Sequence, residues 1–568
     1  MKPRKILIYQ LLPRLLGNKQ TNNIQNGTLE ENGCGKFNDI TGKFLNQLKR
    51  SGYSHVWLIG VLAHASTTDY TQYGIPREYP EIIKGNAGSP YAVRDVYDVD
   101  PDLAMNVNDR MREFEALVER IHRAGMRVII DFVPNHLARN YQSINRPEGV
   151  DEFGSNDDTS VAFSPGNNFY YLPGEELEIQ FPVKKMADAT YRETPAKVTG
   201  NDCFTNKPTP YDWYETVKLN YGIDIQNGSV KHFSEIPDTW YKMREVLNYW
   251  SKKNIDGFRV DMAEMVPLEF WQWVIPQVKK SFPGILFLAE VYNPDAYRLF
   301  LAHDNFDYLY DKVGLYDVLR DVACGYRPSS DITFALNNVG DIQHKMLNFI
   351  ENHDEQRVAS DYFLKSGKSA EAAMIVTACV NVNPVMVYFG QELGERGMDE
   401  EGFSGKNGRT SIFDYWSLDT VRRWNNNGKW NGTLLTKEEK ELQKFYAKLL
   451  TLCNREDALS QGLFYDLMPA NYDNFEFDST RQFAFLRGAG DELILAVVNF
   501  DNKEVEVVVN IPTHAMDFFG IPDNGSFNAF SLLSDSKFNT VFSINSPIRI
   551  KVGATSGELY KISSFSRL

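Results

Sequence analysis

The stretch Gly257–Glu264 places an arginine and a carboxylate at the end of a short apolar run. If that run is a β-strand, its period of two puts Arg259 and Asp261 on the same face. A fixed positive charge beside an aspartate favours the ionised carboxylate, which is the nucleophilic form. The alternative is an ion pair that closes a buried strand and has no part in chemistry. Other strands with the same ending would favour chemistry.

Three further apolar runs end in polar groups. They are residues 127–133 with Asp131, Asn135 and His136, residues 285–291 with Glu290, and residues 346–351 with His353 and Asp354. In a barrel of parallel strands, groups at the carboxyl ends all face one mouth. Packing alone does not require three acids, Asp261, Glu290 and Asp354, to meet there.

Short apolar runs alternate with longer helical patterns along most of the chain, which predicts βα units and a parallel sheet. The runs number eight, as a closed (β/α)8 barrel requires. They lie at residues 6–11, 56–59, 127–133, 257–261, 285–291, 306–310, 346–351 and 385–389.

Two regions break this rhythm. Residues 137–233 are rich in Asn, Asp, Gly, Pro and Tyr, which predicts a subdomain inserted after the third strand. Residues 431–568 read as a helical connection and then strands, with a hairpin expected around the turn Asp501-Asn502-Lys503. The sequence therefore predicts an α/β fold. Residues 1–136 and 234–430 form a (β/α)8 TIM barrel, and the tail forms a C-terminal antiparallel β-sandwich.

The composition of the 568 residues is that of a globular protein, 43% hydrophobic and 24% charged. A formal net charge of -15 argues against nucleic acid or an anionic membrane as a partner. The five cysteines are far apart and form no CxxC pair, so neither a disulfide framework nor a zinc site is indicated. The basic start has no small-residue cleavage site and the chain has no apolar stretch of about 18 residues, so we expect a cytoplasmic protein without a membrane span.

In its motifs the sequence resembles the α-amylase family of glycoside hydrolases (family 13). Order and spacing fit, and the long insertion lies where that family carries its domain B. The matching segments are Ser89-Pro90-Tyr91, Asp131 to His136, Gly257 to Asp261, Glu290, Glu351 to Asp354 followed by Arg357, and Asn383-Pro384 to Glu392.

The resemblance implies a role for each matching residue. Asp261 would be the nucleophile, Glu290 the general acid and then the base, and Asp354 a ligand of the sugar hydroxyls. Arg259 would orient Asp261, while His136 and His353 would hydrogen-bond the sugar and Tyr91 would stack on it. A retaining mechanism, in which one carboxyl is ionised and the other protonated, is likewise implied by the family.

The sequence departs from the family pattern at two places. Glu264 and Met265 stand where many starch-cleaving members have a Lys-His pair, and the domain B motif reads Val217-Lys218-Leu219-Asn220. Both departures favour an acceptor-side preference different from that of an ordinary endo-amylase. The family needs no cofactor for its reaction. Many members hold calcium through an asparagine matching Asn135 and a domain B aspartate, which the sequence does not identify here.

Three functions remain open on the sequence. The first is a retaining hydrolase of α-1,4-glucosidic bonds in α-glucans or maltooligosaccharides. The second is an α-glucan transglycosylase with the same site and a sugar or phosphate acceptor. The third is a non-catalytic glucan-binding barrel, which predicts the loss of at least one acid, whereas Asp261, Glu290 and Asp354 are all present.

Overall fold

The computed structural model describes residues 5–520, 527–534, 539–543 and 547–564, so the basic start, residues 1–4, lies outside it. Its centre is a sheet of eight parallel strands in the order β15-β14-β13-β12-β5-β2-β1-β16. A parallel bridge between Asn348 and Val385 joins the two edges and closes the barrel. The eight predicted runs are these strands: β1 Leu7–Leu11, β2 His55–Leu58, β5 Arg127–Phe132, β12 Gly257–Val260, β13 Leu286–Ala289, β14 Tyr308–Tyr310, β15 Met346–Leu347 and β16 Val385–Tyr388.

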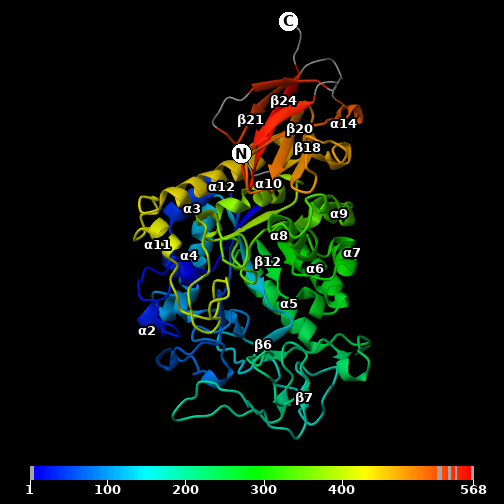
Figure 1. The fold of residues 1–568 in the computed structure, drawn as a ribbon. Helices are drawn as coiled ribbons and strands as arrows, with labels where there is room; N and C mark the ends of the chain where they lie inside the picture. The colour runs from blue at the N-terminus through cyan, green and yellow to red at the C-terminus, as the bar shows by residue number, and fades with distance from the viewer. Residues whose placement is uncertain (1–4, 521–526, 535–538, 544–546, 565–568) are drawn as a thin grey trace.

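Helices surround the barrel and explain why its strands are nearly continuous apolar runs. Almost every residue of the strands is buried, because one face lines the barrel interior and the other packs under helices. Figure 1 shows this ring around β12. The α-helices of the described residues are α1 Pro13–Leu16, α2 Leu29–Asn32, α3 Gly42–Arg50, α4 Arg110–Arg123, α5 Asp238–Ser251, α6 Leu268–Ser281, α7 Tyr297–Leu301, α8 Asp317–Ala323, α9 Asp331–Asn338, α10 Glu371–Cys379, α11 Asp419–Asn425, α12 Lys437–Arg455, α13 Asp457–Ser460 and α14 Thr513–Phe518. The last two, α13 and α14, lie with the C-terminal strands and not in the ring.

The chain makes two excursions at the carboxyl ends of the strands. The first follows β2 and forms an antiparallel pair, β3 Leu62–His64 with β4 Val93–Val99, which the sequence analysis did not predict. The second lies between β5 and α5 and contains three two-stranded sheets. Their strands are β6 His136–Ala138 with β9 Thr216–Lys218, β7 Tyr171–Leu172 with β8 Ala196–Lys197, and β10 Ile223–Asp224 with β11 Val230–Lys231.

A buried carboxylate joins the two excursions. Asp95 on β4 accepts hydrogen bonds from the Ser143 hydroxyl at 2.6 Å and the Ile144 amide at 2.8 Å. In the second excursion, Arg139 is fully buried and pairs with Glu193 at 2.7 Å. These contacts replace regular secondary structure, since the polar backbone of so irregular a segment needs side-chain partners when it is buried. The predicted limits of this insertion and of the other domains stay predictions.

The C-terminal region lies at the end of the barrel opposite β6 and β7 (Figure 1). It holds an antiparallel six-stranded sheet in the order β17-β18-β19-β24-β21-β22 and a separate pair, β20 with β23. The strands are β17 Leu463–Asp466, β18 Gln482–Ala489, β19 Glu492–Asn499, β20 Val505–Val509, β21 Phe527–Ser531, β22 Asn539–Phe542, β23 Ile548–Val552 and β24 Ser556–Ser564.

The hairpin expected around Asp501 is wrong. β19 pairs with β18 and β24, and β20 pairs with β23. Both edges of β19 are therefore taken, and the turn carries the chain from one sheet to the other. Asn499 holds this corner by donating to the carbonyls of Lys503 at 2.9 Å and Gly553 at 3.0 Å.

A buried carboxyl in the eighth-strand motif gives a testable pH dependence of stability. Burial raises the pKa of Glu392 from 4.5 to about 7, and Tyr9 donates a hydrogen bond to it at 2.7 Å. The folded state therefore binds this proton more tightly than the unfolded state, and the wild type loses stability as the pH rises from about 4.5 to about 7.

Glu392→Gln removes the titration and keeps an acceptor for Tyr9. We expect the difference in melting temperature, variant minus wild type, to increase as the pH rises from about 4.5 to about 8. A difference that does not change with pH in differential scanning calorimetry would contradict this assignment.

Candidate active site

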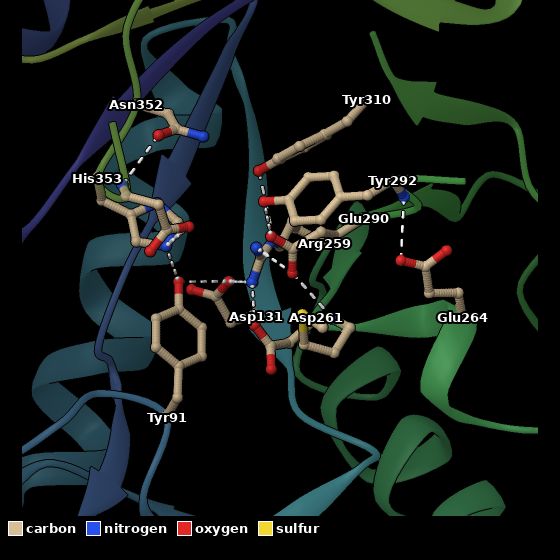
Figure 2. A network of polar contacts seen from close by, with 12 residues as sticks. Tyr91, Asp131, Arg259, Asp261, Glu264, Glu290, Tyr292, Tyr310, Asn352 and His353 are labelled. Carbon is tan, nitrogen blue, oxygen red and sulfur yellow. Dashed lines mark hydrogen bonds and ion pairs between the residues drawn. The ribbon is translucent and has the colours of Figure 1, made fainter. Parts of the chain in front are cut away.

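Arg259 on β12 binds the two acids expected to react. Its Nη1 lies 2.7 Å from Asp261 Oδ1, and its Nη2 lies 2.7 Å from Glu290 Oε2. Nη1 is also 3.4 Å from Asp131 Oδ1 on β5. The guanidinium is fully buried, and Figure 2 shows the carboxyl groups around it. Residues from three neighbouring strand ends thus meet on one cation, as the barrel geometry predicts.

Aromatic rings enclose the guanidinium. The Arg259 Cζ lies 5.4 Å from the ring centroids of Trp57 and Tyr91 and 5.6 Å from that of Tyr310. Its Nε donates to the Tyr310 hydroxyl at 3.3 Å. Burial lowers the pKa of Arg259, but the charges of Glu290 and the other anionic partners raise it more, and the net direction is upward. The arginine is a permanent cation that is fully removed from the surface.

The backbone after β12 also points at Glu290. The Asp261 amide donates to the Phe132 carbonyl at 2.9 Å, which extends the pairing of β12 with β5. The next residue, Met262, has a φ of 44°, a left-handed conformation that is uncommon for a residue with a side chain. This turn lets the Met262 amide donate to Glu290 Oε2 at 2.9 Å. Local backbone strain of this kind clusters at functional sites.

Tyr292 is a site residue that the sequence analysis did not find. Its hydroxyl donates to Glu290 Oε1 at 2.6 Å. Glu264, one of the departures from the family pattern, accepts the backbone amides of Tyr292 at 3.2 Å and Asn293 at 3.1 Å. Figure 2 shows Glu264 on the far side of Tyr292 from Arg259. Its carboxylate therefore holds the segment after β13 in place, and through that segment it places the Tyr292 hydroxyl.

A chain of hydrogen bonds leads from β1 to Asp131. Gln10 Nε2 donates to His353 Nδ1 at 3.0 Å, so His353 Nε2 carries the hydrogen and donates to the Tyr91 hydroxyl at 2.7 Å. Tyr91 in turn donates to Asp131 Oδ1 at 3.4 Å. His353 Nε2 also lies 3.1 Å from Asp354 Oδ2. Burial and the Arg259 charge hold the pKa of His353 well below 6.5, so this imidazole is neutral.

The acids outnumber the cations, and this shows in their pKa values. The pKa of Asp261 is raised well above its usual range, mainly by burial. The Arg259 charge lowers this pKa, in the direction expected from the sequence, but its effect is smaller than that of burial. The Glu290 charge raises the pKa further. Burial raises the pKa of Asp131 to about 6. Desolvation and the Glu290 charge raise the pKa of Asp354 to about 7, although its side chain is 42% exposed. The cluster as a whole therefore keeps protons near neutral pH.

His136 stands on the insertion side of the site. It begins β6, its ring centroid lies 5.2 Å from that of Trp213, and its Nδ1 is 3.1 Å from Asn135 Nδ2. Burial and the Lys218 charge lower the pKa of His136 to about 3, so it is neutral in the working range. Asn135 lies behind it and is fully buried.

Five of the predicted residues line a single cavity of about 430 Å³: Tyr91, His136, Asp261, Glu290 and Asp354. Arg259 and His353 are buried behind it. A larger cavity of about 710 Å³, lined by residues around α11 and α12, contains none of the predicted site residues. The remaining lining of the smaller cavity was not predicted and consists of Lys84, Ser89, Trp213, Glu215, Thr216, Met262, Tyr292, Glu355, Arg409, Ile412 and Phe413.

A closed parallel barrel with paired carboxyls and an arginine at its carboxyl-end mouth is the arrangement of a barrel glycosidase or transglycosylase. The α-amylase catalytic domain family matches residues 10–462. The chain belongs to the α-amylase family.

Individual relatives are distant. Alpha-amylase 2 of Dictyoglomus thermophilum is 22% identical over 431 residues, which are 74% of this chain and 60% of that protein. A cyclomaltodextrinase of a Bacillus species is 22% identical over 87% of this chain and 72% of its own length. The solved structure of a maltogenic α-amylase from Thermotoga neapolitana has a TM-score of 0.63, with 21% identity and full coverage of both chains. In the described residues, no helix is both long and apolar enough to span a membrane.

Arg259→Lys tests the shared cation. A lysine keeps the charge but cannot bind two carboxyls in the fixed geometry of a guanidinium. We expect kcat/KM on a maltooligosaccharide to fall about 100-fold or more, the scale of losing one preorganised electrostatic contact.

Arg110→Lys is the matched control. Arg110 on α4 is also buried, and it binds Asp98 through Nε at 2.9 Å and through Nη2 at 2.6 Å, outside the candidate site. This variant should lose stability and keep its activity. Equal activity losses in the two variants would contradict a specific role for Arg259.

Proposed function

We propose that the protein is a retaining glycosidase acting on α-1,4-linked glucose in α-glucans or maltooligosaccharides. The observation that carries this proposal is the binding of Asp261 and Glu290 to one guanidinium at the wall of a cavity. Double displacement requires two carboxyls beside the reacting carbon, one ionised and one protonated, and Asp261 and Glu290 line the same cavity.

In the first step Asp261 attacks the anomeric carbon and the glycosidic bond breaks. Glu290 transfers its proton to the departing oxygen, and a covalent glycosyl-enzyme with inverted configuration remains. In the second step Glu290, now ionised, takes a proton from water or from an acceptor hydroxyl. That oxygen then displaces Asp261, and the second inversion restores the original configuration.

The surrounding acids affect how many protons the site holds near neutral pH. Asp131 and Asp354 both have raised pKa values, about 6 and about 7, so their environment disfavours further negative charge. The cluster therefore retains a proton near neutral pH, which the reaction can use. Arg259 offsets the negative charge on Asp261 in its attacking form.

The remaining residues position the sugar. Tyr91 and His136 line the cavity and can contact the ring, and Asp354 can accept hydrogen bonds from its hydroxyls. The Nε2 of His353 is directed at Tyr91 and Asp354. We therefore assign His353 the placement of these two side chains in preference to a direct bond to the sugar.

Relatives named α-amylase and cyclomaltodextrinase support an α-glucan as the substrate class. Transfer to a sugar acceptor is the second candidate. Trp213, Tyr292 and Phe413 line the same cavity, and aromatic faces of this kind can hold an acceptor sugar against water. A maltosyltransferase from Salinibacter ruber is also among the relatives, at 23% identity over 53% of this chain.

Incubation with maltoheptaose tests the proposal. We expect shorter maltooligosaccharides whose new reducing ends are α-anomers, as followed by proton NMR before mutarotation. Products longer than the substrate would establish the transferase alternative. Asp261→Asn should lower kcat by about 1,000-fold or more, because the nucleophile is lost.

Glu392→Gln, another isosteric change at a buried acid, should retain activity and serves as the control. Full activity in Asp261→Asn, or no turnover of any α-glucan by the folded wild type, would overturn the proposal. The second outcome would favour a non-catalytic glucan-binding barrel.

A further inference from the structure

We infer that the Lys218 ammonium is a built-in cation that replaces a calcium ion between the insertion and the barrel. Lys218 Nζ donates to Asn135 Oδ1 at 2.6 Å and pairs with Asp202 Oδ1 at 2.9 Å. Its side chain is 5% exposed. Asn135 follows β5 and Asp202 lies in the insertion, so the ammonium joins the two parts of the chain.

These contacts answer the calcium prediction made for Asn135. Asp202 is the insertion aspartate that the sequence did not identify, but both its carboxylate and the Asn135 oxygen are directed at the lysine. Calcium binds its oxygen ligands at about 2.3–2.6 Å, so an ion on Asn135 Oδ1 would have to displace Nζ. The described residues also contain no group of three or more His, Cys, Asp or Glu side chains able to hold a metal. The residues present do not fit calcium.

Lys218 also sets the hydrogen-bonding state of His136. Because Asn135 Oδ1 accepts from the ammonium, the Asn135 amide group must turn its Nδ2 toward the Gly200 carbonyl, 2.9 Å away, and His136 Nδ1, 3.1 Å away. An Nδ1 that accepts a hydrogen bond leaves the hydrogen of the neutral imidazole on Nε2. His136 can then donate from Nε2 to a hydroxyl in the cavity.

The backbone supports the same coupling. Lys218 on β9 is the register partner of His136 on β6 in the two-stranded sheet. Lys218 is therefore a positioning residue, which acts on the candidate subsite through Asn135 and His136. A calcium ion on Asn135 Oδ1 would impose the same amide orientation, so the lysine can supply the function of the metal without the metal.

The first test uses the wild type and does not depend on the reaction. After treatment with EDTA, addition of millimolar calcium should change the melting temperature by less than about 1 °C, because a ligand stabilises only a protein that binds it. An increase of several degrees that disappears in Asn135→Ala would overturn the inference.

The second test rebuilds an anionic site. Lys218→Asp puts a third oxygen side chain beside Asn135 and Asp202, and we expect its melting temperature to be low in EDTA and to rise with calcium but not with magnesium. Lys218→Met should be destabilised with no response to calcium. The inference would be overturned if Lys218→Met were as stable as the wild type. It would also be overturned if calcium raised the melting temperature of Lys218→Met as much as that of Lys218→Asp.

The third test addresses His136 and rests on the proposed function. In Lys218→Met we expect KM on maltoheptaose to rise about tenfold, with the ¹⁵N shifts of His136 showing hydrogen on Nδ1 in part of the population. An unchanged KM and tautomer would overturn the positioning role, while the calcium tests would still decide the metal replacement.

Lys242 provides the matched control. It is another buried lysine at the edge of the insertion, with its Nζ 2.8 Å from both Asn168 Oδ1 and Asp238 Oδ2. Lys242→Met should lose stability without a change in KM or in the His136 tautomer. A similar KM increase in both variants would show a general loosening of the insertion and would overturn the positioning role.

Discussion

The active end of the barrel depends on the binding of several acids by the single guanidinium of Arg259. Asp261 and Glu290 follow neighbouring strands, and in the absence of a cation their charges would repel each other. A guanidinium presents several donors in a rigid plane, so it can hold both carboxyls at defined angles. The strands supply the separation and the arginine supplies the attraction. Neighbouring strand ends and the shared arginine together bring these two acids to one place.

Buried cations serve the same purpose at the edge of the insertion. This region has little regular secondary structure, and Arg139, Lys218 and Lys242 are among the side chains that satisfy its polar groups. Each of these side chains binds a carboxylate together with other oxygen atoms, which offsets the cost of removing its charge from water. A lysine carries this cation in the chain itself. The stability of the site then does not vary with the concentration of a free ion, as it does for a bound metal.

The barrel and the central acids could be predicted because both are encoded in contiguous stretches. The apolar run that ends in Arg259 and Asp261 predicts both a strand and the polar residues at its end. Glu264 and Lys218 could not be assigned this way, because their roles arise from contacts with residues far away in sequence. Tyr292 binds Glu290, only two residues before it, but a single tyrosine beyond a strand end forms no motif that the sequence reveals. Glu264 was read as a departure from a family pattern, and only the structure shows its carboxylate on the amide of Tyr292. The hairpin around Asp501 failed for a similar reason, since strand pairing is decided by neighbours that a local turn signal does not reveal.

The excess of acids over cations is itself part of the chemistry. Asp131 could have been a neutral residue if it served packing alone, yet it lies 3.4 Å from Arg259 and accepts a hydrogen bond from the Trp57 indole at 3.2 Å. Its charge raises the pKa of Asp261, whereas the charge of Arg259 lowers it. This surplus of negative charge favours retention of a proton within the cluster near neutral pH.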